Sequence, residues 1–149
     1  MKKFSFSLEK LKHYKERMLE AEKNNLGILR RELVVLNGQL QEIFDNITDK
    51  QSELAAKLIS GITPVDMAVR KRFITTRKQD AQLKQIEIVR KEDEIARQLE
   101  VVLELQKEVA SLEKLEENQL EEYRMLELKE TEQFIDEFMT NADFRKQNA

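Results

Sequence analysis

The stretch "SGITP", Ser60 to Pro64, decides the fold of this chain. It holds the only proline and one of only three glycines among 149 residues, and both of its flanks are rich in Leu, Glu, Lys and Gln. Gly61 can take the left-handed conformation that ends a helix. Thr63 and Pro64 are typical of the N-cap and first residue of a following helix, with Asp66 at the third position, close to a capping box. The sequence therefore predicts a short turn at 60–64 between two antiparallel helices.

The composition supports long helices rather than an ordinary globular core. Charged residues make up 37% of the chain, aromatic residues only 6%, and tryptophan is absent. Such a composition is typical of long helices or of disorder. The 40% of hydrophobic residues is too many for disorder.

The charge and cysteine content exclude several classes of function. The net charge of −3 does not favour nucleic-acid binding, and the absence of cysteine excludes disulfides and thiolate chemistry. No apolar run precedes Glu9, so the start is not a secretory signal. No run of 18 apolar residues occurs that could span a membrane. We therefore expect a soluble chain.

Apolar residues before the turn follow intervals of three and four, the pattern of a coiled-coil seam. Upstream we expect the seam to continue with a shift of one position near Gly27, an interior glycine that weakens a helix. After the turn the same intervals recur. The predicted seam residues are Leu29, Leu33, Leu36, Leu40, Ile43, Ile47, Leu54 and Leu58, then, after the shift, Leu11, Tyr14, Met18, Ala21 and Ile28, and on the second helix Ile88, Ile95, Leu99, Val102 and Val109.

Blocks of charge provide an independent test of the folded-back arrangement. Residues 1–31 carry a net charge of +5 and residues 92–137 a net charge of −11. Residues 32–64 carry −3 and residues 65–91 carry +5. Folding at the turn places each block against one of opposite sign, whereas a parallel dimer would bring like charges together. Such charges set orientation more than stability.

We therefore predict an all-α fold, a single antiparallel two-helix coiled-coil hairpin over residues 1–149 with a longer C-terminal helix. The predicted bounds are helix 1 at about 5–59, the turn at 60–64, helix 2 at about 65–139 and a tail at 140–149. Facing residues have numbers that add to about 124, which brings Leu36 to Ile88 and Leu29 to Ile95. Everything after about Leu120 then lacks a partner within the chain.

The end without a partner is apolar, and Phe4 and Phe6 come to the same end. A long helix generally buries such a stripe against something else. A frayed tip or a contact between two copies is one interpretation, and docking into another protein is the other. The apolar residues after Leu120 are Tyr123, Met125, Leu126, Leu128, Phe134, Ile135 and Phe138.

Residue patterns for catalysis or cofactor binding are poor. The three glycines are isolated, and His13 lies in a charged stretch typical of a helix surface. The carboxylates of "KEDE", 91–94, diverge around a helix rather than converge on a metal. The basic stretch 70–78 lacks any nucleic-acid-reading motif. We predict no catalytic residue, no cofactor, no metal and no nucleic acid, so that enzyme is the least supported class.

Three stretches together resemble the flagellar export protein FliJ family, in the family's order and over nearly the whole chain. They are "FSFSLEKLKHYKERMLEAE" at 4–22, "SGITPVDMAVRKRFI" at 60–74 and "LEKLEENQLEEYRMLELKETEQFIDEF" at 112–138. The family usually has a second leucine after the residue that matches Leu11. Lys12 departs from this, at a point where we expect the helix to turn toward solvent.

The resemblance implies a cytoplasmic, non-enzymatic component of the flagellar type III export apparatus, peripheral to the inner face of the cell membrane and not inserted in it. The family's coiled coil is similar to the stalk of rotary ATPases. It inserts its terminal end into the hexameric export ATPase, contacts the cytoplasmic domain of the membrane export gate and can escort export chaperones. A self-associating structural coiled coil and an injectisome-type stalk are the alternatives.

The resemblance also implies two sets of contact residues. For the export gate, the family's contact surface lies early in helix 2, which points to Phe73 and, one turn on, to Arg77, where the family often has leucine. For the ATPase we expect contacts at the terminal end of the hairpin. The expected ATPase-docking residues are Phe4, Phe6, Leu8, Tyr123, Leu126, Phe134, Ile135 and Phe138.

Overall fold

The computed structural model of the chain describes residues 2–148 and contains two helices, α1 (Glu9–Ser60) and α2 (Pro64–Gln147). No strand occurs among these residues. The chain divides into two compact units. We call residues 21–102 the hairpin unit, and residues 2–20 together with 103–148 the terminal unit. The predicted all-α fold of two packed helices, the second of them longer, is confirmed.

The turn has the geometry that its sequence predicts. Gly61 has a φ of 110°, and its N–H donates to the carbonyl of Lys57 at 2.8 Å, which closes α1. The Thr63 hydroxyl accepts a hydrogen bond from the N–H of Asp66 at 3.1 Å, and Pro64 is the first residue of α2. Three non-helical residues, 61–63, therefore join the two helices.

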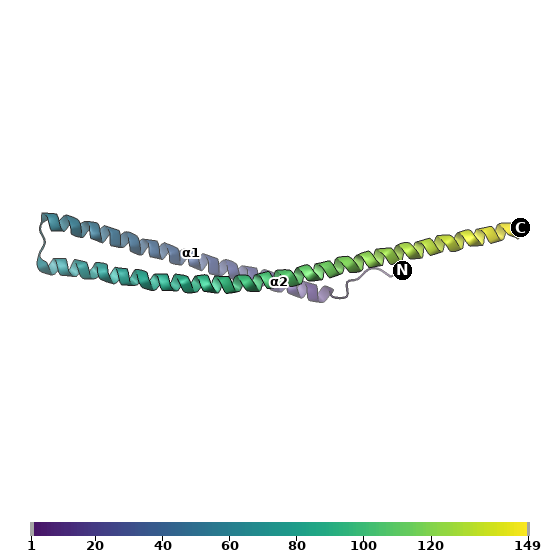
Figure 1. Ribbon diagram of the computed structural model, residues 1–149, viewed down its shortest axis with the longest axis horizontal. Coiled ribbons are helices and arrows are strands. Elements are labelled where there is room, and N and C mark those ends of the chain that lie inside the picture. The colour runs from purple at the N-terminus through teal and green to yellow at the C-terminus, as the bar shows by residue number, and fades with distance from the viewer. Residues whose placement is uncertain (1, 149) are drawn as a thin grey trace. The chain divides into compact units, whose positions relative to one another are not determined.

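In the hairpin unit, α1 and α2 run antiparallel from the turn, side by side (Figure 1). Their contact is a seam at intervals of three and four residues, as expected for a two-stranded coiled coil. The main buried cluster consists of Ile43, Ile47, Ile74 and Ala81, with Leu40 and Leu54 packed against it. Leu26, Ile88 and Val102 are also buried.

Half of the seam positions on α2 in this unit are polar, which sequence analysis missed. At intervals of seven residues, between the apolar positions, α2 places cations whose side chains are 19–32% exposed. Each reaches an acceptor on α1. The pairs are Arg70 with Glu53 (3.5 Å), Arg77 with Asn46 (3.0 Å), Lys84 with Gln39 (3.0 Å) and Lys91 with Glu32 (2.7 Å). We call these four pairs the cation ladder.

The cation ladder fixes the register of the hairpin unit. In each of its four pairs the two residue numbers add to 123, close to the predicted 124. This register places Leu36 level with Ile88, in agreement with the prediction. The long stems of Lys and Arg can cover leucines of the seam while their charged ends reach polar groups at its edge.

The predicted shift of the seam near Gly27 is wrong. Leu11, Tyr14 and Ile28, which the shift assigned to the seam, are 41%, 57% and 45% exposed, whereas Leu26 is buried. The seam of α1 keeps its phase, and polar residues occupy the positions where apolar ones are missing. The prediction of a shift came from the assumption that every seam position is apolar. Gly27 itself lies within the unbroken helix α1.

Two predicted boundaries differ from the structure. Helix α1 begins at Glu9 rather than near residue 5, because the residues before it leave the helix to pack on α2. Helix α2 continues to Gln147, so the predicted tail at 140–149 is wrong over its described part. The stretch 140–147 contains neither Gly nor Pro, and Arg145 and Lys146 lie in the last turn, where cations are favourable.

The same substitution at two glycines should have opposite effects on stability. Gly38 lies within α1 with open space around the position of a Cβ atom, so Gly38→Ala should stabilise the fold by about 1 kcal/mol. Gly61 has a positive φ, so Gly61→Ala should cost about 1–2 kcal/mol. Urea unfolding followed by circular dichroism measures both. Equal shifts of the two variants would contradict the geometry of the turn.

Candidate docking surfaces

In the terminal unit, the residues before α1 pack on α2. Phe6 is only 7% exposed. The Phe4 ring lies 5.5 Å from the Tyr123 ring, centroid to centroid, and the Tyr123 hydroxyl donates to the carbonyl of Lys2 at 2.6 Å. Leu8 is half-buried. Phe4, Phe6 and Tyr123, three of the eight expected docking residues, thus pack the N-terminal segment on α2.

Two ion pairs complete the packing of this unit. Lys12 Nζ lies 2.7 Å from Glu116 Oε2, and Lys15 Nζ lies 2.8 Å from Glu108 Oε2. The hydrogen bond to Glu116 raises the pKa of Lys12 above its ordinary value, and the bond to Glu108 does the same to the pKa of Lys15. The Lys12 side chain is 18% exposed, so the expectation that it turns toward solvent is wrong.

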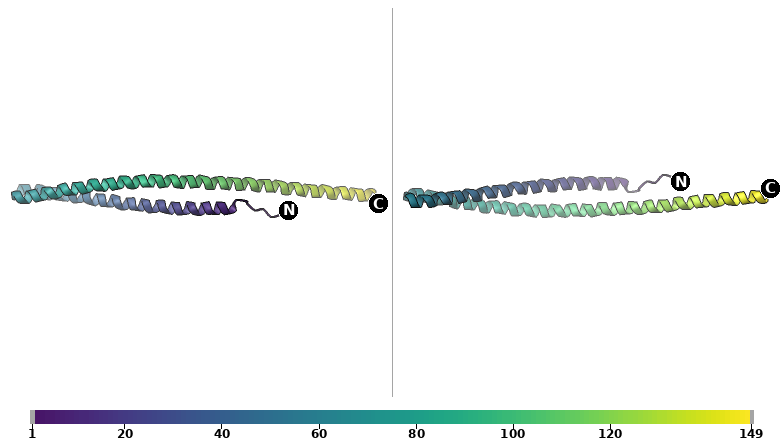
Figure 2. Two further views of the ribbon diagram at one scale, coloured as in Figure 1. Left: turned by 90° about the horizontal axis from the view of Figure 1, so that it is seen from below. Right: turned by 90° about the horizontal axis from the view of Figure 1, so that it is seen from above.

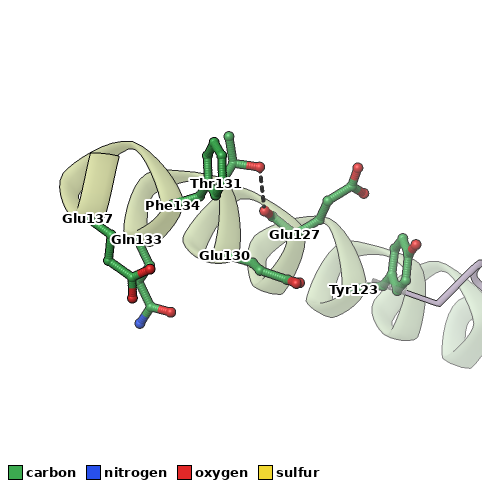
Figure 3. Close-up of a pocket in the computed structure, with 7 residues that line it drawn as sticks. All are labelled: Tyr123, Glu127, Glu130, Thr131, Gln133, Phe134 and Glu137. Atoms are coloured by element: carbon green, nitrogen blue, oxygen red, sulfur yellow. Dashed lines mark hydrogen bonds between the residues drawn. The ribbon is translucent and has the colours of Figure 1, made fainter. Parts of the chain in front are cut away.

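Beyond Tyr123, α2 continues past the N-terminal segment (Figure 2). The seam face becomes polar there, with Glu130, Gln133 and Glu137 at the positions that would continue the seam. An open groove follows this face (Figure 3). We call it the acidic groove. Its lining residues are Tyr123, Glu127, Glu130, Thr131, Gln133, Phe134 and Glu137.

The opposite side of the same stretch is apolar. At 100° per residue, a row of positions 125, 128, 132, 135, 139 and 142 lies on the side of α2 opposite the acidic groove. Its large apolar members are 52–63% exposed. We call this row the outer stripe. It consists of Met125, Leu128, Glu132, Ile135, Met139 and Ala142.

The four expected docking residues after Tyr123 are exposed but do not share one face. Ile135 belongs to the outer stripe, Phe134 lines the acidic groove, and Phe138 lies between the two; these three are 52%, 69% and 65% exposed. Leu126 is 57% exposed on the seam side. The expectation did not include Leu128 and the two methionines of the stripe, although the seven-residue spacing of positions 128, 135 and 142 could have indicated them.

The two expected gate residues lie in different surroundings in the hairpin unit. Phe73 is 43% exposed, and Lys50 Nζ lies 5.9 Å from the centroid of its ring. A shallow groove near the turn is lined by Lys50, Asp66, Val69, Arg70 and Phe73. Val69, which is 62% exposed, was missed by sequence analysis.

Arg77, by contrast, is engaged within the fold. It belongs to the cation ladder and also donates to Asp80 at 3.0 Å. Its side chain therefore does not extend the surface around Phe73.

Comparison with known proteins adds one finding. A family model described as flagellar FliJ protein matches residues 4–148. No curated protein and no solved structure matches the chain. Neither helix of the described residues has a stretch long and apolar enough to cross a membrane.

Replacing Glu116 by Gln should lower the pKa of Lys12, measured by NMR of the lysine side chains. A raised pKa in the folded state means that the pair stabilises the fold below about pH 10.5, and that this contribution is lost as the pH rises through the pKa of Lys12. The melting temperature of Glu116→Gln should therefore lie below that of the wild type at pH 7, and the gap should narrow above pH 10.5.

Glu117→Gln is the matched control, because its carboxylate meets only the exposed Lys114 at 3.8 Å. It should change neither the pKa of Lys12 nor the melting temperature. An unchanged pKa of Lys12 in Glu116→Gln would contradict the pairing.

Proposed function

The chain belongs to the flagellar FliJ family, and on that premise we propose that it is a non-catalytic stalk of the flagellar type III export apparatus. The terminal unit docks into the ring of the export ATPase and promotes its assembly and activity. The hairpin unit contacts the cytoplasmic domain of the membrane export gate near the turn. The protein acts in the cytoplasm, at the inner face of the membrane, and escorts export chaperones.

One observation carries the ATPase contact: α2 continues as an exposed helix after Tyr123 with large apolar side chains. Residues 125–144 include three phenylalanines that are 65–69% exposed. Exposed apolar surface of this density is typical of an interaction site. The N-terminal segment is bound to α2 at Phe6 and Tyr123, so it supports the docking end rather than forming it.

The gate contact is supported by the exposed pair Val69 and Phe73. They lie one turn apart on α2, on the same face and close to the turn. Lys50 lies over the Phe73 ring in the same groove, so a partner surface that combines an apolar centre with an acidic group beside Lys50 fits here. We therefore replace Arg77 by Val69 in the proposed contact.

The second candidate function is self-association through the exposed end of α2. It accounts for the same apolar residues but gives no role to the surface around Phe73. The two functions differ in the state of the isolated chain: a monomer at micromolar concentration leaves the end of α2 available for a foreign partner.

Removing residues 125–149 should abolish binding to the export ATPase and stimulation of its activity. The truncation keeps Tyr123, so the packing of Phe4 and Phe6 on α2 stays intact. Circular dichroism should show a helical chain with nearly the wild-type melting temperature. A truncated chain that stimulates the ATPase as well as the full chain does would refute the proposed docking end.

Phe73→Ala should weaken binding to the cytoplasmic domain of the export gate and reduce motility. The melting temperature should change little, because the substitution removes an exposed interaction with Lys50 that is worth about 0.5–1 kcal/mol. Phe44→Ala is the matched control, since Phe44 on α1 of the same unit is 40% exposed. If both variants bound the gate equally well, the surface around Phe73 would not be the contact.

A further inference from the structure

The outer stripe has the spacing of a second coiled-coil seam. Its positions follow intervals of three, four, three, four and three residues, the same pattern that joins α1 to α2. The apolar seam face ends at Leu126, after which Glu130, Gln133 and Glu137 follow. The outer stripe begins at Met125, on the opposite side of the helix. The sequence thus ends one helix-binding face and opens another within one turn.

One member of the outer stripe is charged: Glu132 lies between Leu128 and Ile135. Covering this row with an apolar surface would bury a carboxylate without a partner, which is costly. The chain shows how it accommodates such a residue in its own seam. Glu116 lies at a seam position of the terminal unit and meets Lys12 at 2.7 Å.

We propose that the outer stripe binds one amphipathic helix of the partner, and that this helix carries a lysine or arginine opposite Glu132. The inference rests on the proposed function, which names the export ATPase as the partner. The apolar members of the stripe bury the face of that helix, and the pair at Glu132 fixes its register. Helices recognised in this way present apolar anchors at intervals of three and four residues.

A second copy of the chain fits this face less well. Paired antiparallel about the middle of the stripe, two copies would bury Glu132 opposite Ile135 in two layers, where the other copy offers no cation. Paired in parallel, Glu132 would face Glu132. Either arrangement buries Glu132 without a cation opposite it, which is costly.

The test measures binding of the full-length chain to the purified export ATPase by titration calorimetry at two salt concentrations. Glu132→Gln should weaken binding about 10-fold, because the cation on the partner loses its pair. Its affinity should also depend less on salt than that of the wild type. Glu137→Gln, on the acidic groove, is the matched control and should bind as the wild type does.

Glu132→Leu tests whether the residue of the partner that faces position 132 is charged or apolar. It completes the apolar row, so it should tighten binding if the partner presents an apolar residue there, and weaken binding if the partner presents a cation. Tighter binding would overturn the inference. A further matched pair is Ile135→Gln, expected to weaken binding, and Thr131→Gln, which lies on the acidic groove and should have little effect.

The outcomes distinguish this inference from the proposed function. If the wild-type chain does not bind the ATPase, both fail. If it binds and only the variants of the acidic groove weaken binding, the ATPase contact stands and the outer stripe is not its site. Sedimentation of the wild type as a dimer that Ile135→Gln dissociates would assign the stripe to a second copy and would also overturn the inference.

Discussion

The fold of the hairpin unit depends on half-buried cations that lie beside the leucines of its seam. Four cations of α2 occupy seam positions at seven-residue intervals, and each must reach an acceptor on α1 because an unpaired charge in the seam is costly. A slip of three or four residues would leave at least two of the four cations without an acceptor. A slip of seven would give most of the cations an acceptor again. The three-residue turn, closed by Gly61, selects among these registers, so ladder and turn together define one alignment.

The terminal unit uses the same device with the charges exchanged. There α1 supplies the cations, Lys12 and Lys15, and α2 supplies the carboxylates, Glu116 and Glu108. These two ion pairs belong to the blocks of opposite net charge, residues 1–31 and residues 92–137. Charged pairs of this kind contribute more to specificity than to stability. They make each half of α1 complementary to one half of α2, which disfavours parallel pairing of two copies.

The turn, the antiparallel arrangement and the register could be predicted from sequence because each depends on local rules: a glycine at positive φ, a capping threonine and a repeating apolar interval. The phase of the seam before Leu26 could not be predicted. Lys12 and Lys15 occupy seam positions there, and a lysine is taken for a surface residue until its partner on the other helix is known. The packing of Phe4 and Phe6 on α2 could not be predicted either, because the ring that Phe4 contacts, Tyr123, lies far along the chain. The proposed docking surfaces could be predicted from sequence only as a region, since the face of an exposed helix that a partner would use depends on that partner.

The stretch of α2 after Tyr123 has a thermodynamic consequence for whatever binds it. No packed neighbour within residues 2–148 supports its backbone after the N-terminal segment ends, so its helix depends on the propensity of its own residues and on continuity with the packed part of α2. A partner that binds the helical form must also order any part of the end that frays, so the apparent affinity scales with the fraction that is helical. Warming reduces that fraction. Attachment at this end is thus set by the helix propensity of the segment as well as by its contacts.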